Sequence, residues 1–247
     1  MFDFQSDLIF PTHAVTRAGP LPKDAEQLSL KVGRETLSGV HIPGDARRRG
    51  GATLILGFAG NAWNSQDAAE YLHELYPDHE VVVFHYRGYA PSSGSPSAEA
   101  LLADAPLVYD FAVKKLKPKR IVAVGLSIGS GIAAHLAGER PLDGVILVTP
   151  FDSLKAVAQG MYPWLPIGRF FQHEIDAAAP LERSSVPVAL VAGERDELIP
   201  AARTKALRGR VKNLVFDSTV RGAGHNDIYS RSAFQEAMRE ALDALIG

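Results

Sequence analysis

The stretch Arg120–Gly131 reads Arg-Ile-Val-Ala-Val-Gly-Leu-Ser-Ile-Gly-Ser-Gly. Its first part, residues 121–124, is a short apolar run rich in β-branched residues, which is typical of a strand buried on both faces of a parallel sheet. Small and apolar side chains then recur at helical spacing at Ile132, Ala133, Leu136 and Ala137. The stretch therefore predicts a strand, a sharp turn and a helix that meet at one serine, Ser127.

This serine lies in the pattern Gly125-Leu126-Ser127-Ile128-Gly129, a Gly-x-Ser-x-Gly. The pattern alone is weak, but its position between a strand and a helix favours a strained turn that presents a nucleophile. The same geometry explains both glycines, because a side chain there would collide where strand and helix nearly touch. We expect the N–H of Ile128 to be free to bind a developing oxyanion. The rival Ser130 lies inside the predicted helix and is expected to pack or cap.

The composition of the 247 residues is that of an ordinary globular protein, with a net charge of −2 and no cysteine. The near-balanced charge gives no general attraction to nucleic acid or anionic lipid. Disulfides and thiolate chemistry are excluded, and the eight histidines lack ligand spacing, so we expect no metal site. No run approaches the roughly 20 apolar residues that span a bilayer, and the first residues lack the basic start and apolar core typical of a signal peptide, so we expect a cytoplasmic protein without stable membrane insertion. The oligomeric state is not predicted.

Strand-like and helix-like segments alternate from residue 53 to the end. The expected strands are 53–56, 81–84, 121–124, 144–148, 186–191 and 211–216, and the expected helices include 98–116, 201–207, 232–246 and one N-capped by Ser65. Upstream, 28–32 and 37–42 alternate and predict an antiparallel pair, whereas residues 1–26 are expected to be irregular. The pattern predicts one α/β domain over 1–247, with a mostly parallel, doubly wound sheet and a short cap insert at about 151–185. Ligands bind at the carboxyl ends of such strands.

The loop Gly57-Phe-Ala-Gly-Asn-Ala-Trp-Asn64 follows one of these strands. Its small residues allow backbone N–H groups to approach a substrate closely, so the loop is a candidate oxyanion site. The alternative is a simple tight turn between strand and helix.

A serine hydroxyl needs a base, and the base needs an orienting carboxylate. Two later turns offer these groups in the order that doubly wound hydrolases use, acid before histidine. Asp196 follows one predicted strand in Gly-Glu-Arg-Asp-Glu-Leu-Ile-Pro, and His225 follows the next in Gly-His-Asn. The rival carboxylates are Glu194, Glu197, Asp217 and Asp227, each of which could instead form a surface ion pair. Among the other histidines only His173 is of interest.

With these motifs, the chain resembles the serine-nucleophile branch of the α/β-hydrolase superfamily over nearly its full length. The family pattern Gly-x-x-Asp-x-x-Ile/Val-Pro is matched by residues 193–200, and the family's histidine likewise follows a glycine. The resemblance is closest to a subgroup with the oxyanion loop His-Gly-Asn-Ala-Gly-Asn and a next strand ending Tyr-Arg-Gly-Tyr-Gly. This chain has Ala-Gly-Asn-Ala-Trp-Asn at 59–64 and Tyr-Arg-Gly-Tyr-Ala at 86–90, so Ala59 and Trp63 depart from the pattern.

The resemblance implies an esterase, lipase or thioesterase acting on a small-molecule ester or acyl substrate through an acyl-enzyme, with no cofactor. Ser127 would attack, His225 would carry the proton and Asp196 would orient the imidazole. The N–H of Asn61 would join that of Ile128 in the oxyanion hole. One alternative is a peptidase or amidase on the same fold. Another is a catalytically silent binding module, although such proteins usually lose a member of the triad.

The insert is unusually aromatic, which favours a substrate with an apolar acyl group. The expected contacts are Tyr162, Trp164, Leu165, Phe170 and Phe171, with Tyr89 as a further candidate. The alternative is that these side chains only pack the insert onto the body of the domain.

Overall fold

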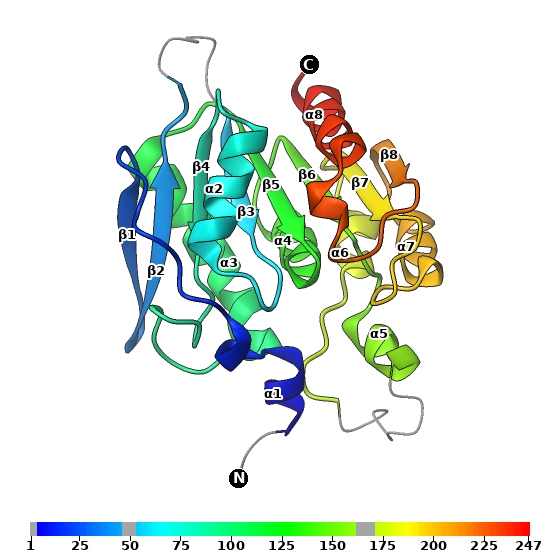
Figure 1. Cartoon of the computed structure of the whole chain (residues 1–247), viewed down its shortest axis with the longest axis horizontal. Helices are drawn as coiled ribbons and strands as arrows, with labels where there is room; N and C mark the ends of the chain where they lie inside the picture. The colour runs from blue at the N-terminus through cyan, green and yellow to red at the C-terminus, as the bar shows by residue number, and fades with distance from the viewer. Residues whose placement is uncertain (1–3, 46–52, 162–170) are drawn as a thin grey trace.

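The structure is a computed structural model that describes residues 4–45, 53–161 and 171–247 (Figure 1). In these ranges eight strands form one sheet in the order β1-β2-β4-β3-β5-β6-β7-β8. The strands are β1 (Glu26–Val32), β2 (Glu35–Ile42), β3 (Leu54–Phe58), β4 (Glu80–Phe84), β5 (Ile121–Leu126), β6 (Gly144–Val148), β7 (Val188–Gly193) and β8 (Leu214–Val220). Strand β2 pairs antiparallel with β1 and β4, and the remaining pairs are parallel. The predicted mostly parallel α/β fold with antiparallel N-terminal strands is therefore confirmed.

Helices cover both faces of this sheet (Figure 1). They are α1 (Phe4–Ile9), α2 (Ser65–Leu75), α3 (Ala98–Leu116), α4 (Ile128–Glu139), α5 (Leu154–Met161), α6 (Ala178–Arg183), α7 (Ala201–Arg208) and α8 (Ser232–Ile246), with short 3-10 turns η1 (Thr12–Ala14) and η2 (Ile228–Ser230). Apolar residues of α3, α4 and α6 form one core, and those of α2 and α8 form a second core on the opposite face. None of the helices in the described part is both long and apolar enough to cross a bilayer.

Side chains of the central strands point alternately to the two faces of the sheet, and both faces are buried, so the sequence of each strand is a continuous apolar run. In β3, Leu54 and Leu56 pack into the core beneath α3 and α4, whereas Ile55 between them packs toward α2 and α8. All three are 0% exposed. A strand with water on neither face must be apolar at every position, so it shows no period of two.

Several helix boundaries match the sequence prediction, and two details do not. The bounds of α3 and α8 are those predicted, and α3 keeps Pro106 inside it. The N-cap of α2 is Asn64 rather than Ser65, because Asn64 Oδ1 accepts the N–H of Gln66 at 2.9 Å while the Ser65 hydroxyl donates to the C=O of Phe84. Residues 1–26 are not wholly irregular, because they contain α1 and η1.

The predicted insert contains two helices within the described residues. Helix α5 follows β6 after a short turn, and the bridge between Ser153 and Asp176 closes the base of the segment. Helix α6 packs against α4 and buries Ala178 and Leu181. Residues 162–170, which include four of the predicted aromatic and apolar contacts, lie outside the described residues.

Candidate active site

Ser127 occupies the turn between β5 and α4 in a strained backbone conformation. Its φ of 54° and ψ of −118° lie in a region that residues other than glycine rarely adopt. Its N–H donates to the C=O of Val148 at 3.0 Å, and its own C=O accepts from the N–H of Ser130 at 2.8 Å. Strain of this kind persists only where neighbouring structure fixes it, and here it leaves the Ser127 side chain on the wall of a cavity.

The two glycines of the motif lie where strand and helix touch. A Cβ at Gly125 would lie 2.3 Å from the carbonyl oxygen of Gly129, and a Cβ at Gly129 would lie 2.1 Å from that of Phe58. Neither oxygen belongs to a flexible side chain that could move aside. The reason inferred from the sequence therefore holds for Gly125, whereas Gly129 is required because α4 also approaches the end of β3 at Phe58.

We expect Gly129→Ala to lower the free energy of unfolding by about 3 kcal/mol or more, because the clash is with backbone. Urea denaturation measures this change. The control is Gly160→Ala in α5, where a Cβ meets nothing within 4 Å. That variant should gain up to about 1 kcal/mol from helix propensity. Equal unfolding midpoints for the two variants would contradict the strand–helix contact.

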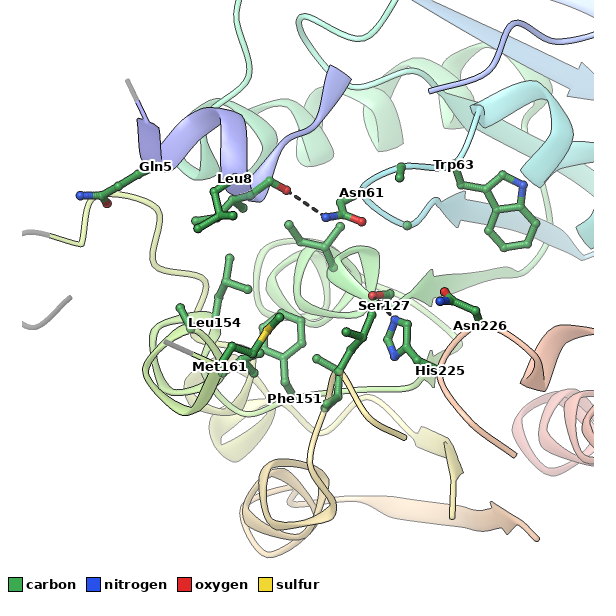
Figure 2. Close-up of a pocket in the computed structure, with 18 of the residues that line it drawn as sticks. Gln5, Leu8, Asn61, Trp63, Ser127, Phe151, Leu154, Met161, His225 and Asn226 are labelled. Atoms are coloured by element: carbon green, nitrogen blue, oxygen red, sulfur yellow. Dashed lines mark hydrogen bonds between the residues drawn. The ribbon is translucent and has the colours of Figure 1, made fainter. Parts of the chain in front are cut away.

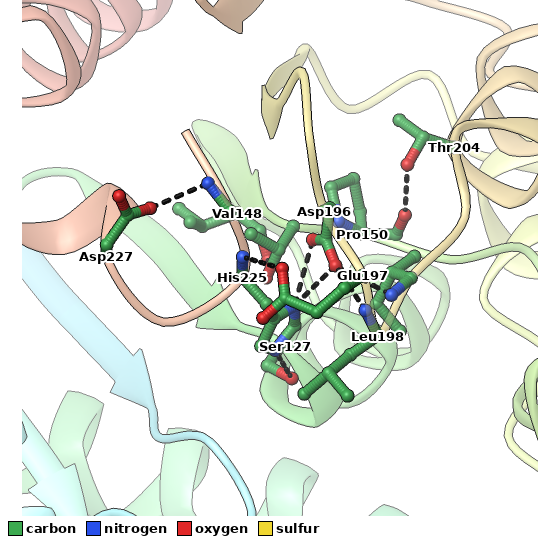
Figure 3. A network of polar contacts seen from close by, with 12 residues as sticks. Ser127, Val148, Pro150, Asp196, Glu197, Leu198, Thr204, His225 and Asp227 are labelled. Atoms are coloured by element: carbon green, nitrogen blue, oxygen red, sulfur yellow. Dashed lines mark hydrogen bonds and ion pairs between the residues drawn. The ribbon is translucent and has the colours of Figure 1, made fainter. Parts of the chain in front are cut away.

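His225 connects Ser127 to Asp196 by an unbroken chain of hydrogen bonds (Figure 3). Its Nε2 lies 2.9 Å from Ser127 Oγ, and its Nδ1 lies 2.8 and 3.0 Å from the carboxylate oxygens of Asp196. Asp196 Oδ1 also accepts the N–H groups of Leu198 and Ile199 at 3.0 and 2.7 Å. An ionised carboxylate only accepts hydrogen bonds, so in this arrangement it would keep the imidazole proton on Nδ1 and leave the Nε2 lone pair facing the serine hydroxyl.

The rival carboxylates Asp217 and Asp227 both form ion pairs away from the imidazole. Asp217 pairs with Arg208, and Asp227 pairs with Arg231. The second oxygen of Asp227 accepts the N–H of Gly224 at 2.6 Å. These are the surface ion pairs that the sequence offered as the alternative to a catalytic role.

Glu194 and Glu197 hold the backbone of the loop that carries His225. Glu194 accepts the N–H of Gly222 at 2.7 Å, and Glu197 accepts the backbone N–H of His225 itself at 3.1 Å. Figure 3 shows Glu197 and Asp196 reaching the same histidine, one through its backbone and one through its ring. Sequence reasoning missed this role of Glu197, for which its place beside Asp196 was the available signal.

The acid loop and the histidine loop are also joined through their backbones. The N–H of Arg195 donates to the C=O of Ala223 at 2.8 Å. A Cβ at Gly193 would lie 2.6 Å from the same carbonyl oxygen, so only glycine allows this approach. The two loops thus form one unit that sets the position of the imidazole.

The rival serine and histidine lie elsewhere. Ser130 is 0% exposed inside α4, and its hydroxyl has no hydrogen-bond partner among the described residues. His173 is buried against Phe10 and bonds through Nε2 to the hydroxyl of Ser6 at 2.8 Å.

The loop after β3 lies beside the serine. A Cβ at Gly60 would be 3.8 Å from that of Ser127, and the N–H of Trp63 closes a turn onto the C=O of Gly60 at 3.3 Å. Asn61 and Ile128 both line the cavity, and within the described part of the chain their backbone N–H groups have no hydrogen-bond partner. Both remain predicted oxyanion donors.

A cavity of about 750 Å³ extends from the serine and histidine (Figure 2). Its polar end carries Ser127, His225, Asn61 and Asn226. The rest is mostly apolar, and the larger apolar or aromatic side chains that line the cavity are Leu8, Ile9, Trp63, Ile128, Phe151, Leu154, Val157, Met161, Phe171, Leu198, Ile199 and Tyr229.

The predicted substrate contacts have different outcomes. Phe171 lines the cavity, whereas Tyr162, Trp164, Leu165 and Phe170 lie outside the described residues. Tyr89 is not among the described residues that line the cavity. It is 3% exposed, and its ring packs edge-on against that of Tyr86, with 5.7 Å between the ring centroids. The sequence missed the contribution of α1, for which the run Leu8-Ile9-Phe10 was the available signal.

Comparisons with known proteins agree with this architecture. A family model described as the alpha/beta hydrolase fold matches residues 54–167. An uncharacterised protein from Mycobacterium tuberculosis is 32% identical over 222 residues, covering 85% of this chain and 78% of the other. A lysophosphatidylserine lipase from Danio rerio is 29% identical over 195 residues, covering 67% of this chain and 51% of the lipase. A solved structure of an alpha-beta hydrolase from Vibrio vulnificus superposes with a TM-score of 0.79 at 19% identity, covering 98% and 92%.

Proposed function

The chain belongs to the α/β hydrolase family, and on that premise we propose that it is a serine hydrolase that cleaves carboxylic esters with an apolar acyl group. The observation that carries this proposal is the hydrogen-bonded chain from Asp196 through His225 to Ser127, placed at the polar end of a largely apolar cavity. A relative that is a lipase by name accords with an acyl ester substrate.

In the first half of the reaction Ser127 Oγ attacks the ester carbonyl carbon while His225 Nε2 takes the hydroxyl proton. The negative charge that develops on the carbonyl oxygen is bound by the N–H groups of Asn61 and Ile128. Asp196 stabilises the imidazolium through Nδ1. The intermediate then collapses, the C–O bond to the alcohol breaks, and His225 gives its proton to the departing alcohol. An acyl group remains on Ser127.

Water completes the cycle. His225 Nε2 takes a proton from the water as its oxygen attacks the acyl carbon, and the same backbone N–H groups bind the oxyanion. The bond to Ser127 Oγ breaks, the serine recovers its proton from His225, and the carboxylic acid leaves. A thioester passes through the same steps with a thiol as leaving group.

Hydrolysis of p-nitrophenyl esters from acetyl to dodecanoyl, with acyl thioesters as a second series, tests the proposal. Each buried methylene is worth about 0.8 kcal/mol, so kcat/KM should rise roughly fourfold per carbon until the cavity is filled. Absence of turnover together with absence of labelling by a fluorophosphonate would favour a silent binding module. Cleavage of peptide amides without esters would favour a peptidase.

We expect Glu197→Ala to lower kcat by roughly tenfold, because the loop that positions His225 loses an anchor. Glu197→Gln is the matched control, since its amide oxygen can still accept the backbone N–H of His225, and its kcat should stay within about threefold of wild type. Both variants are compared at saturating p-nitrophenyl butyrate with unfolding curves recorded in parallel. Equal kcat values for Ala and Gln would assign no positioning role to this hydrogen bond.

A further inference from the structure

Helix α1 forms one side of the cavity, although it stands far from the serine in the sequence. Its residues Gln5, Leu8 and Ile9 line the space that leads away from Ser127. Figure 2 shows Leu8 on one side of this space, with Leu154 and Met161 of α5 on the other. A chain extending from the serine therefore passes between α1 and α5.

Contacts with two distant segments fix α1 in this place. The side-chain amide of Asn61 donates to the C=O of Ile9 at 3.0 Å, which ties α1 to the loop after β3. The backbone N–H of Gln172 donates to the side chain of Gln5 at 3.1 Å. Because these two contacts involve residues near opposite ends of α1, the helix is fixed along its length.

The residue after α1 strengthens this attachment. Phe10 is 2% exposed, and its ring meets the ring of His173 edge-on with 5.2 Å between the ring centroids. His173 also bonds to the hydroxyl of Ser6 at 2.8 Å. The apolar anchor and the polar contacts thus act on the same short segment.

Leu8 is unusual within this wall because it is 39% exposed while lining the cavity. Met161, across the cavity on α5, is 42% exposed and also lines it. An apolar ligand that covers exposed apolar surface at the open end of a pocket removes that surface from water, which favours binding. Figure 2 shows Leu8 and Met161 lying away from Ser127, so we expect a longer alkyl chain to reach them more fully than an acetyl group does.

We propose that α1 is the outer wall of the acyl pocket and that Leu8 is a specificity-determining residue selecting medium and long acyl chains. The inference rests on the proposed esterase function and names its substrate class. Because Asn61 bonds to α1 through its side chain and offers its backbone N–H to the oxyanion, one residue connects the wall that holds the acyl chain to the group that holds the reacting carbonyl.

The test compares Leu8→Ala and Leu8→Gln with wild type on acetyl, butyryl, octanoyl and dodecanoyl p-nitrophenyl esters. Both replacements are good helix formers, so α1 is preserved. Loss of the apolar contact should lower the octanoyl-to-acetyl ratio of kcat/KM by about three- to tenfold in Leu8→Ala, and further in Leu8→Gln. Activity on acetate should fall less than activity on octanoate in both variants, since an acetyl group offers fewer methylene contacts to lose.

Leu107→Ala is the matched control, because Leu107 is 40% exposed on α3 and is not among the described residues lining the cavity. Its chain-length profile should equal that of wild type. Parallel profiles for the Leu8 variants and wild type would overturn the proposal while leaving the esterase function in place.

Binding of dodecanoate, followed by tryptophan fluorescence, separates the two claims. If wild type hydrolyses no ester yet binds dodecanoate at least threefold more tightly than Leu8→Gln, the acyl pocket stands and the proposed reaction fails. If wild type neither hydrolyses esters nor binds dodecanoate, both proposals are overturned.

Discussion

Ser127→Ala is expected to abolish ester hydrolysis, lowering kcat by about 10⁶-fold, the loss that follows removal of the nucleophile from a serine triad. His225 and Asp196 cannot compensate, because the imidazole then has no hydroxyl to activate. The fold should persist, since among the described residues the Oγ of Ser127 bonds only to His225, and alanine meets the same backbone constraint at φ 54°. Turnover of p-nitrophenyl butyrate and the urea unfolding curve measure both effects.

Ser130→Ala is the matched control for this experiment. Its hydroxyl is buried in α4 and lacks a hydrogen-bond partner in the described ranges, so its removal should leave kcat unchanged. A fluorophosphonate should label wild type and Ser130→Ala but not Ser127→Ala. Labelling that persists in Ser127→Ala and disappears in Ser130→Ala would show that the nucleophile is Ser130 and not Ser127.

Asp196→Asn is expected to lower kcat by roughly 10⁴-fold with little change in stability, the size of the effect known for the corresponding change in a serine protease. The amide offers an N–H where the carboxylate offered only lone pairs. This favours the imidazole tautomer with its proton on Nε2, which cannot accept the hydroxyl proton of Ser127. The amide oxygen can still accept the N–H groups of Leu198 and Ile199, so the loop should keep its shape.

Asp217→Asn controls for loss of a carboxylate on β8, the strand that neighbours β7. Asp217 pairs with Arg208 and makes no contact with the imidazole, and exposed pairs of this kind are worth at most about 1 kcal/mol. Its kcat should remain near that of wild type. If Asp217→Asn or Asp227→Asn were inactive while Asp196→Asn turned over normally, the acid would be misassigned.

The sequence predicts the part of the site whose geometry is local. The turn around Ser127 depends on glycines that lie close together in the chain, and a Cβ at Gly125 would clash with Gly129 at the start of the helix that follows. The clash at Gly129 is instead with Phe58, at the end of a strand that is distant in the sequence. Asp196 and His225 could be placed because each follows a strand, and parallel strands bring their carboxyl ends to one edge of the sheet.

What the sequence does not predict depends on contacts between distant segments. Helix α1 has only six residues, too few to be stable alone, and it forms because Asn61 and Gln172 bond to it. The motif Tyr-Arg-Gly-Tyr placed Tyr89 near the strand ends, but packing against Tyr86 turns its ring into the core. Neither arrangement leaves a period or a spacing in the sequence.

The position of β8 has a consequence for how the protein loses activity. Ser127 follows the central strand β5, whereas the loop carrying His225 follows β8, an edge strand whose side chains alternate between partly buried and exposed up to the buried Val220. Edge segments open in local fluctuations that cost less free energy than global unfolding. Such an opening separates the base from the nucleophile while the central sheet stays folded. Inactivation by heat or denaturant would then precede loss of the tertiary structure. The stability of the edge strand β8 would set the range of temperature and denaturant concentration in which the enzyme is active.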